Sequence, residues 1–116
     1  MANDIPGKLT VANDVIAEMA GYAALESYGV VGMADPNLRD GIAKLLPNNR
    51  LRKGIEIRKS EDGAICADLY IVVEHGTNLA EVSRMLAEKV AYVLQDSAQL
   101  PVESVDVHVQ GVKIRD

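Results

Sequence analysis

Two short patterns, Cys66-x-Asp68 and Asp106-x-His108, carry side chains that could bind a metal ion. Thiolate, imidazole and carboxylate groups together suit zinc. However, side chains two residues apart share one face of any β-strand, so this spacing also follows from simple strand alternation. An open sheet face is a poor cage for an ion. A zinc site is therefore one interpretation, but we expect no metal site here.

The two histidines, His75 and His108, are the candidates for proton transfer. General acid–base catalysis needs a poised group, an orienting partner and a cleft poor in water. No motif marks a nucleophile or a partner for either histidine. We expect His75 to lie in a turn and His108 on the surface of a strand. The sequence therefore predicts no catalytic residue, no cofactor and no enzyme.

A nucleic-acid or anionic-lipid site is a further alternative. Residues 29–32 form a Gly-x-x-Gly pattern like the loop with which KH domains hold nucleic acid, but both middle residues are valine, which favours a helix end and tight packing. Residues 39–59 carry a net charge of +5, although the whole chain carries −5. Binding through this basic segment would be sensitive to salt. The simpler interpretation is a solvated charge cluster.

The preferred candidate surface is one face of a predicted sheet. Tyr70 and Val72 stand there among polar residues, and tyrosine is enriched in contact surfaces between proteins. Glu56 belongs to the same face. Strand edges offer a second route, through self-pairing or through addition of a partner strand. The residues predicted to contact a partner are Arg58, Asp68, Tyr70, Val72, Asp106 and His108.

The strands that position these residues follow from alternation. Residues 54–59 and 64–74 alternate around a turn at residues 60–63, where Gly63 can supply positive φ. The second strand directs its apolar residues to one face and its polar ones to the other, which predicts one packed and one largely open face. Shorter strands are expected at residues 7–11 and 30–34, and a last strand at 102–114. The core positions of the second strand are Ile65, Ala67, Leu69, Ile71 and Val73.

Two long helices are predicted from apolar residues at three- and four-residue spacing. The first covers residues 13–28, with Gly21 approaching a neighbouring backbone closely and Gly29 following in a left-handed conformation. The second is capped by Thr77 or Asn78 and ends before Pro101. A short helix is expected near residues 36–46. The stripe of the second helix comprises Leu79, Val82, Leu86, Val90, Val93 and Leu94.

These elements predict an α+β fold, a two-layer sandwich. A mixed, mainly antiparallel sheet carries both long helices on one face, in the order β-α-β-β-β-α-β plus the short helix. The length of 116 residues fits one domain, residues 1–116. With 48% hydrophobic residues but only 3% aromatic ones, the core must be aliphatic. The single cysteine fits a reducing compartment, and no apolar run suits a signal peptide or membrane span, so we expect a soluble cytoplasmic protein.

Three blocks of the chain resemble the alkaline-shock-protein family. They are GYAALESYGVVGMA (residues 21–34), DLYIVVEHGTN (68–78) and SVDVHVQGVKI (104–114). Their order and spacing match the family over roughly residues 7–114. The resemblance implies a bacterial protein, chiefly of Gram-positive species, that serves cell-envelope stress response or homeostasis without established catalysis.

The resemblance also implies partners. The prototype forms homo-oligomers or filaments and lies near the membrane by binding a small membrane-anchored protein. Compact ends make this chain more similar to a short subfamily, often encoded beside a dihydroxyacetone-kinase-like protein linked to fatty-acid phosphorylation. The leading hypothesis is therefore a non-enzymatic interaction or scaffold protein that self-associates and reaches the membrane only through a partner. The alternative is an accessory or regulatory subunit of that kinase.

Overall fold

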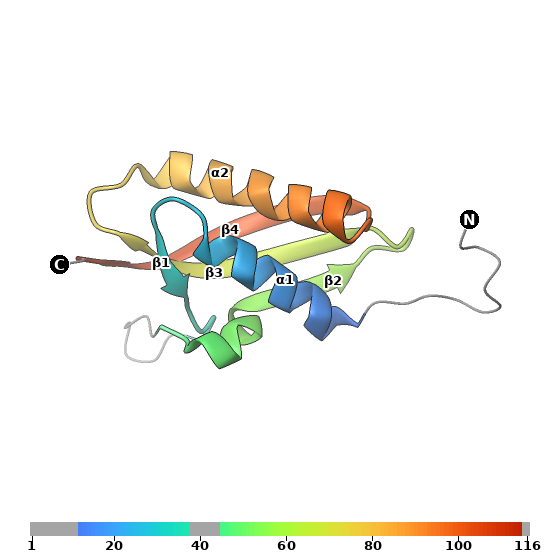
Figure 1. Cartoon of the computed structure of the whole chain (residues 1–116), viewed down its shortest axis with the longest axis horizontal. Helices are drawn as coiled ribbons and strands as arrows, with labels where there is room; N and C mark the ends of the chain where they lie inside the picture. The colour runs from blue at the N-terminus through green and yellow to red at the C-terminus, as the bar shows by residue number, and fades with distance from the viewer. Residues whose placement is uncertain (1–11, 38–44, 115–116) are drawn as a thin grey trace.

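The computed structural model describes residues 12–37 and 45–114 (Figure 1). Two helices and a four-stranded sheet form its main elements, and two short helical segments connect them. In chain order the elements are α1 (Asn13–Leu25), β1 (Val30–Met33), η2 (Asn48–Gly54), β2 (Ile55–Lys59), β3 (Ile65–Glu74), α2 (Leu79–Tyr92), η3 (Val93–Ser97) and β4 (Val102–Lys113).

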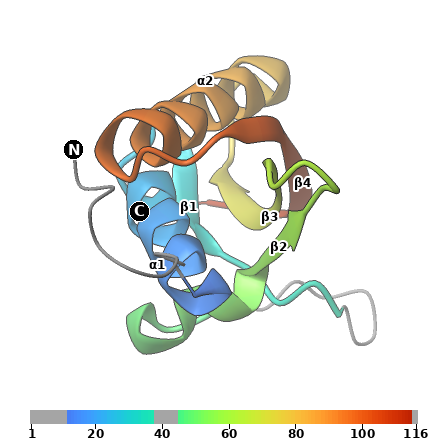
Figure 2. The same cartoon turned by 90° about the vertical axis from the view of Figure 1, so that its right-hand side faces the viewer.

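The sheet is organised around β3. Strands β1 and β2 both pair with β3 in antiparallel fashion, while β4 pairs with it in parallel. The parallel pair follows from the connection through α2, since parallel strands need a crossover of helical length. Both helices cover the same face of the sheet (Figures 1 and 2). The predicted two-layer α+β sandwich with a mixed, mainly antiparallel sheet is confirmed.

The core lies between the sheet and the two helices, and it is aliphatic as predicted. The inward residues of β3 are fully buried at the five predicted positions, Ile65, Ala67, Leu69, Ile71 and Val73. Helix α1 contributes Ile16 and several alanines, and α2 contributes Val82, Leu86 and Val90. No aromatic side chain belongs to the core cluster of the described residues.

Helix α1 ends at Leu25, earlier than the predicted residue 28. The N–H groups of Glu26 and Ser27 donate to the carbonyls of Ala23 and Ala24, and such three-residue bonds tighten the last turn. Gly29 has a φ of 82°, so its left-handed conformation is confirmed, but it serves the turn into β1. Gly21 is closely packed, since a Cβ there would lie 3.1 Å from the Cβ of Leu51, but its neighbours are side chains of Leu51 and Ile55 and not the predicted sheet backbone.

The connection between β1 and β2 departs most from the prediction. Most of the helix expected near 36–46 falls outside the described residues, as does the strand expected at residues 7–11. At its described end that helix is wrong, because Leu45 forms an antiparallel bridge with Ala34. Segment η2 is not predicted at all. Its only apolar residue is Leu51, which is 2% exposed and packs in the core. A single apolar residue forms no periodic pattern from which a helix could be predicted.

Helix α2 begins as predicted. The side-chain oxygen of Asn78 accepts a hydrogen bond from the N–H of Glu81 at 3.0 Å, which is a normal N-cap. The predicted stripe is wrong at Leu79, the first residue of α2, which is 46% exposed. The π-helical turn η3 then ends the helix before Pro101. Within residues 12–37 and 45–114, no helix is long and apolar enough to cross a membrane.

Candidate functional site

The outer face of the sheet, which faces away from both helices, brings together most of the residues predicted to contact a partner. Strand β3 supplies Asp68 and Tyr70 at its centre. The register places Asp106 of β4 opposite Asp68 and His108 opposite Tyr70. Strand β2 adds Glu56 opposite Asp68 on the other side.

Asp68 is the anchor of this face. Asp68 is buried, with 9% of its surface exposed, and both of its carboxylate oxygens have partners. The guanidinium Nη2 of Arg58 donates to Oδ2 at 2.8 Å, and Nε2 of His108 lies 3.0 Å from Oδ1. The hydrogen bond with His108, followed by that with Arg58, lowers the pKa of the Asp68 carboxyl against the opposing effect of burial. In return, Asp68 raises the pKa of Arg58.

Tyr70 extends the arrangement along β3. Its ring stacks on the imidazole of His108, with ring centroids 4.6 Å apart and planes 15° from parallel. Its hydroxyl donates to Oε1 of Glu56 at 3.2 Å. Burial, and then the Glu56 carboxylate, raise the pKa of Tyr70, so the phenol stays protonated and keeps its donor. We call these interlocked residues the sheet-face cluster: Glu56, Arg58, Asp68, Tyr70 and His108.

Val72 does not belong to the exposed surface, so this part of the prediction is wrong. It is 4% exposed, although it points outward as expected. The reason lies in its neighbours: its register partners are Gly32 and Gly111, and the side chain of Leu45 lies against Gly32. The side-chain amide of Gln110 also donates to the carbonyl oxygens of Asp35 and Pro36, which draws that segment toward β4.

The expectation of a largely open face is likewise wrong for β3 itself. Cys66 is 8% exposed as well, because β3 is an interior strand with neighbours on both sides. The exposed part of the face is carried by the neighbours. The side chain of Arg58 is 63% exposed and that of His108 is 43% exposed, and Asp106 is exposed on β4.

The zinc interpretation gains no support. Within the described parts of the chain, no group of three or more His, Cys, Asp and Glu residues is placed to hold a metal ion. The Cys66 thiol points to Oε2 of Glu103, at 3.7 Å, and not to Asp68. The KH-type loop is contradicted, because residues 30–32 lie inside strand β1.

One group of surface residues escapes the sequence analysis. Tyr22, Tyr28 and Tyr92 are 54%, 64% and 63% exposed, and all three lie in or beside the helical layer. A signal for them exists, because tyrosine is the only aromatic residue in the chain. The enrichment of tyrosine in contact surfaces, which singles out Tyr70, holds equally for the other three tyrosines.

The pKa of Asp68 leads to a pH prediction. A carboxylate whose pKa is lowered by folding stabilises the protein above its unfolded pKa of about 3.9, and this stability is lost as pH falls through the folded value. Asp68→Asn should therefore cost roughly 1–2 kcal/mol at pH 7, and the difference from wild type should shrink below about pH 4. Urea unfolding between pH 7 and 3 measures this.

Glu61→Gln is the control for this experiment, since it removes one negative charge from the exposed hairpin turn. It should leave the acid-dependent loss of stability unchanged. Parallel stability curves for wild type and Asp68→Asn over the whole range would show that the buried carboxylate carries no stabilising charge.

Comparisons with known proteins give a consistent result. The model of the alkaline shock protein family, described as having a cell envelope-related function, matches residues 1–114. The protein YloU of Bacillus subtilis is 38% identical over 109 residues, which cover 93% of this chain and 90% of that protein. Spy1614 of Streptococcus pyogenes is 35% identical over 113 residues, covering 97% and 93%. Both relatives are described as uncharacterized.

Solved structures with a similar fold come from a protein named MamM CTD. Its form spanning residues 215–293 gives a TM-score of 0.51 at 16% identity, covering 90% of this chain and all of that one. The M250L form gives a TM-score of 0.50 at 18% identity, covering 88% and 96%. Identities this low indicate a shared chain topology and nothing about function.

Proposed function

We propose that this chain, which belongs to the alkaline shock protein family with its cell envelope-related function, is a non-catalytic interaction protein that contacts a protein partner through the sheet-face cluster. The proposal includes association with further copies of itself as part of a scaffold. In this proposal the protein reaches the membrane only by binding a partner.

The observation that supports this proposal is the fixed geometry of exposed contact groups around a buried anchor. The two carboxylate oxygens of Asp68 hold one residue each, Arg58 and His108. Tyr70 is held by Glu56 through its hydroxyl and by His108 through ring stacking. Arginine and tyrosine are the residue types that most often dominate binding energy at interfaces. Because their conformations are already fixed, less entropy is lost when a partner binds.

The same geometry argues against catalysis by the Asp68–His108 pair. In a catalytic carboxylate–histidine pair, the second ring nitrogen is hydrogen-bonded to a nucleophile and the carboxylate stabilises the imidazolium that forms. Here Asp68 is shared with Arg58, which neutralises its charge, and one face of the His108 ring is covered by Tyr70. The cluster is therefore better suited to holding a shape than to moving protons.

Self-association is a separate part of the proposal, and light scattering over a range of concentrations tests it. Strand β4 pairs with β3 alone among the described strands, so its other edge is one route for such contact. The alternative function, an accessory subunit of a dihydroxyacetone-kinase-like protein, differs in its partner. Capture of that kinase from native lysate would favour the alternative.

We expect Arg58→Ala and Tyr70→Ala each to weaken partner binding by about tenfold or more, the usual effect at an interface hot spot. Lys59→Ala is the matched control, because it removes the same charge from the next residue of β2, whose side chain belongs to the other face. Tyr70→Phe should retain binding, since it keeps the stack on His108. Affinity capture from bacterial lysate, with quantitative mass spectrometry, measures these effects.

The outcome is decided by the contrast between the two faces of β2. Envelope proteins should be enriched by wild type and Lys59→Ala and lost with Arg58→Ala. Identical sets of captured proteins for all variants would rule out the sheet-face cluster as the contact surface.

A further inference from the structure

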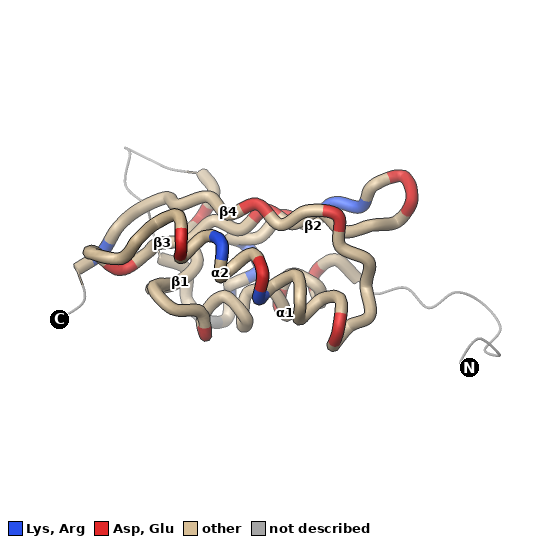
Figure 3. The backbone as a smooth tube through the Cα atoms, turned by 90° about the horizontal axis from the view of Figure 1, so that it is seen from above, with Lys and Arg blue, Asp and Glu red and all other residues tan. Residues whose placement is uncertain are grey.

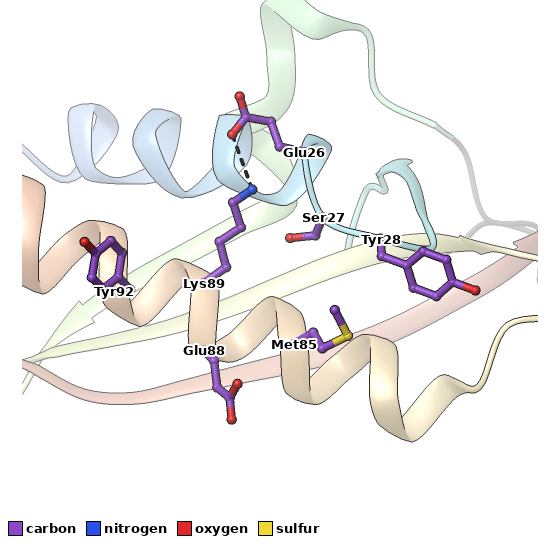
Figure 4. A pocket seen from close by; sticks show the side chains of 7 residues that line it. All are labelled: Glu26, Ser27, Tyr28, Met85, Glu88, Lys89 and Tyr92. Carbon is purple, nitrogen blue, oxygen red and sulfur yellow. Dashed lines mark ion pairs between the residues drawn. The ribbon is translucent and has the colours of Figure 1, made fainter.

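A second surface lies in the helical layer, on the opposite side of the molecule from the sheet-face cluster. Where the end of α1 runs beside α2, a groove of about 410 Å³ opens to solvent (Figure 4). Tyr28 and Met85 line one end and Tyr92 lines the other. Lys89 reaches across from α2 to Glu26, with 3.4 Å between Nζ and Oε1, and this ion pair stands between the two ends. We call this feature the tyrosine groove.

The residues that α2 supplies to the groove repeat at helical spacing. Met85, Lys89 and Tyr92 follow each other at four- and three-residue intervals, so they form one stripe beside the buried stripe of Val82, Leu86 and Val90. Met85 and Tyr92 lie two turns apart, about 10 Å along the helix axis. This is also the distance between residues i and i+7 of a helix that lies along the groove.

Exposed aromatic residues here have no structural role in the core. The core is aliphatic, yet Tyr28 and Tyr92 are each more than 60% exposed and Met85 is 37% exposed. Tyrosine and methionine are enriched at interfaces, where they bury large areas against a partner. An exposed tyrosine pair flanking a groove is therefore typical of a docking surface.

Charge decides which occupant fits. The two helices with their adjoining residues, 13–26 and 79–97, carry six carboxylates and two cations, a net charge of −4, and acidic positions recur along both helices (Figure 3). Both cations are already paired within this surface, Arg84 with Glu81 and Glu88, and Lys89 with Glu26. The carboxylates are Asp14, Glu18, Glu26, Glu81, Glu88 and Asp96.

The excess of carboxylates in the two helices, which the ion pair of Glu18 with Arg52 of η2 only partly offsets, disfavours three occupants by simple repulsion. A second copy presenting the same face would bring two such surfaces together, and phosphate groups of nucleic acid or anionic lipid would meet the same sign of charge. A partner with lysine and arginine beside apolar anchors matches both properties of the groove.

We propose that the tyrosine groove binds a basic amphipathic α-helix of a protein partner, which places apolar residues at positions i, i+3 or i+4, and i+7 against Tyr28, Met85 and Tyr92. Lysine or arginine residues of that helix lie over Glu26 and Glu88. This proposal rests on the proposed function as an interaction protein, but it concerns a different surface and a defined class of ligand.

The probe that tests it is an amphipathic peptide of about 18 residues, with leucine at three- and four-residue spacing and lysine at the other positions. Fluorescence anisotropy of the labelled peptide measures its affinity for the full chain at two salt concentrations. A peptide of the same composition in scrambled order tests whether helical amphipathicity is required. A peptide with glutamate in place of lysine tests whether positive charge is required, and together they exclude nonspecific binding. We expect only the amphipathic lysine peptide to bind, and to bind more weakly at high salt.

The variants locate the site. Tyr28→Ala and Tyr92→Ala should each reduce affinity by at least about tenfold. Tyr22→Ala is the matched control, because Tyr22 is similarly exposed on α1 but lines a separate hollow with Glu18 and Arg52. It should change affinity by less than about twofold. All of these side chains are exposed, so the fold should persist, and circular dichroism checks it.

Several results would overturn the proposal: no binding of the lysine peptide, equal binding of the scrambled peptide, or equal affinities for Tyr22→Ala and Tyr92→Ala. A dimer in light scattering that Tyr92→Ala dissociates would also overturn it, since the groove would then belong to a second copy. Arg58→Ala should leave peptide affinity unchanged. The groove can thus fail while the sheet-face cluster stands, and the reverse also holds.

Discussion

Leu86→Ala should lower the free energy of unfolding by about 2–5 kcal/mol, among the largest effects of any single truncation in this chain. Leu86 is fully buried at the centre of α2, where it packs in the cluster between helices and sheet. The loss has two parts: the transfer free energy of the removed methyl groups and the cavity they leave. An aliphatic core without large aromatic rings has few side chains able to fill such a space. Urea unfolding at neutral pH measures the change.

Leu79→Ala provides a matched control in the same helix. The residue type and the secondary structure are the same, but Leu79 is 46% exposed. Its truncation should change stability by less than about 1 kcal/mol. If both substitutions cost the same, Leu79 would belong to the core, as the apolar spacing of the sequence alone suggests, and the position of α2 on the sheet would be wrong.

Gly29→Ala should lower the free energy of unfolding by about 2–5 kcal/mol, for two reasons. Gly29 has a φ of 82°, a conformation that costs an L-residue about 1–2 kcal/mol. In addition, a Cβ at this position would lie 2.6 Å from Cγ2 of Val82, a buried residue of α2, and such overpacking costs about 1–3 kcal/mol. Thermal and urea unfolding of the variant measure the total.

Two comparisons separate these contributions. Gly63 has a similar φ of 87° with nothing within 4 Å of the position of a Cβ, so Gly63→Ala should show the backbone cost alone, about 1–2 kcal/mol. The double variant Gly29→Ala/Val82→Ala should lose less stability than the sum of its single changes, because the clash is relieved. Additive losses, or equal costs at Gly29 and Gly63, would show that no clash exists.

For the sheet-face cluster, the sequence predicts which residues share a face but not which of them contact one another. Strand alternation by itself places Arg58, Asp68, Tyr70 and His108 on one face. It cannot say that β3 and β4 are parallel neighbours, which puts His108 opposite Tyr70, since residues 70 and 108 are far apart in the sequence. Nor can it anticipate the burial of Val72, which depends on glycines in two other strands and on Leu45.

The sequence marks the tyrosines as the only aromatic residues, but it does not place Tyr28 and Tyr92 around one groove, for a related cause. The sequence predicts Tyr28 at the end of the first helix, whereas the structure places it beyond α1, and Met85 and Tyr92 resemble ordinary continuations of an apolar pattern. Their exposure arises only because α1 and α2 lie side by side and cover the sheet with their other faces (Figure 2). Whether an apolar residue is core or surface is decided by which faces two helices turn to each other.

Local physics, readable from the chain, determined the identity of the elements. Alternation specifies β3, helical spacing specifies α1 and α2, and Asn78 and Gly63 mark a helix start and a turn through their own side-chain and backbone preferences. Tertiary structure decided the rest: the order of strands around β3, the helical turn η2 held by the buried side chain of Leu51, and the pairing of Asp68 with both Arg58 and His108. The reason is that these features depend on contacts between residues distant in sequence, and each such contact is chosen by the packing of the whole core.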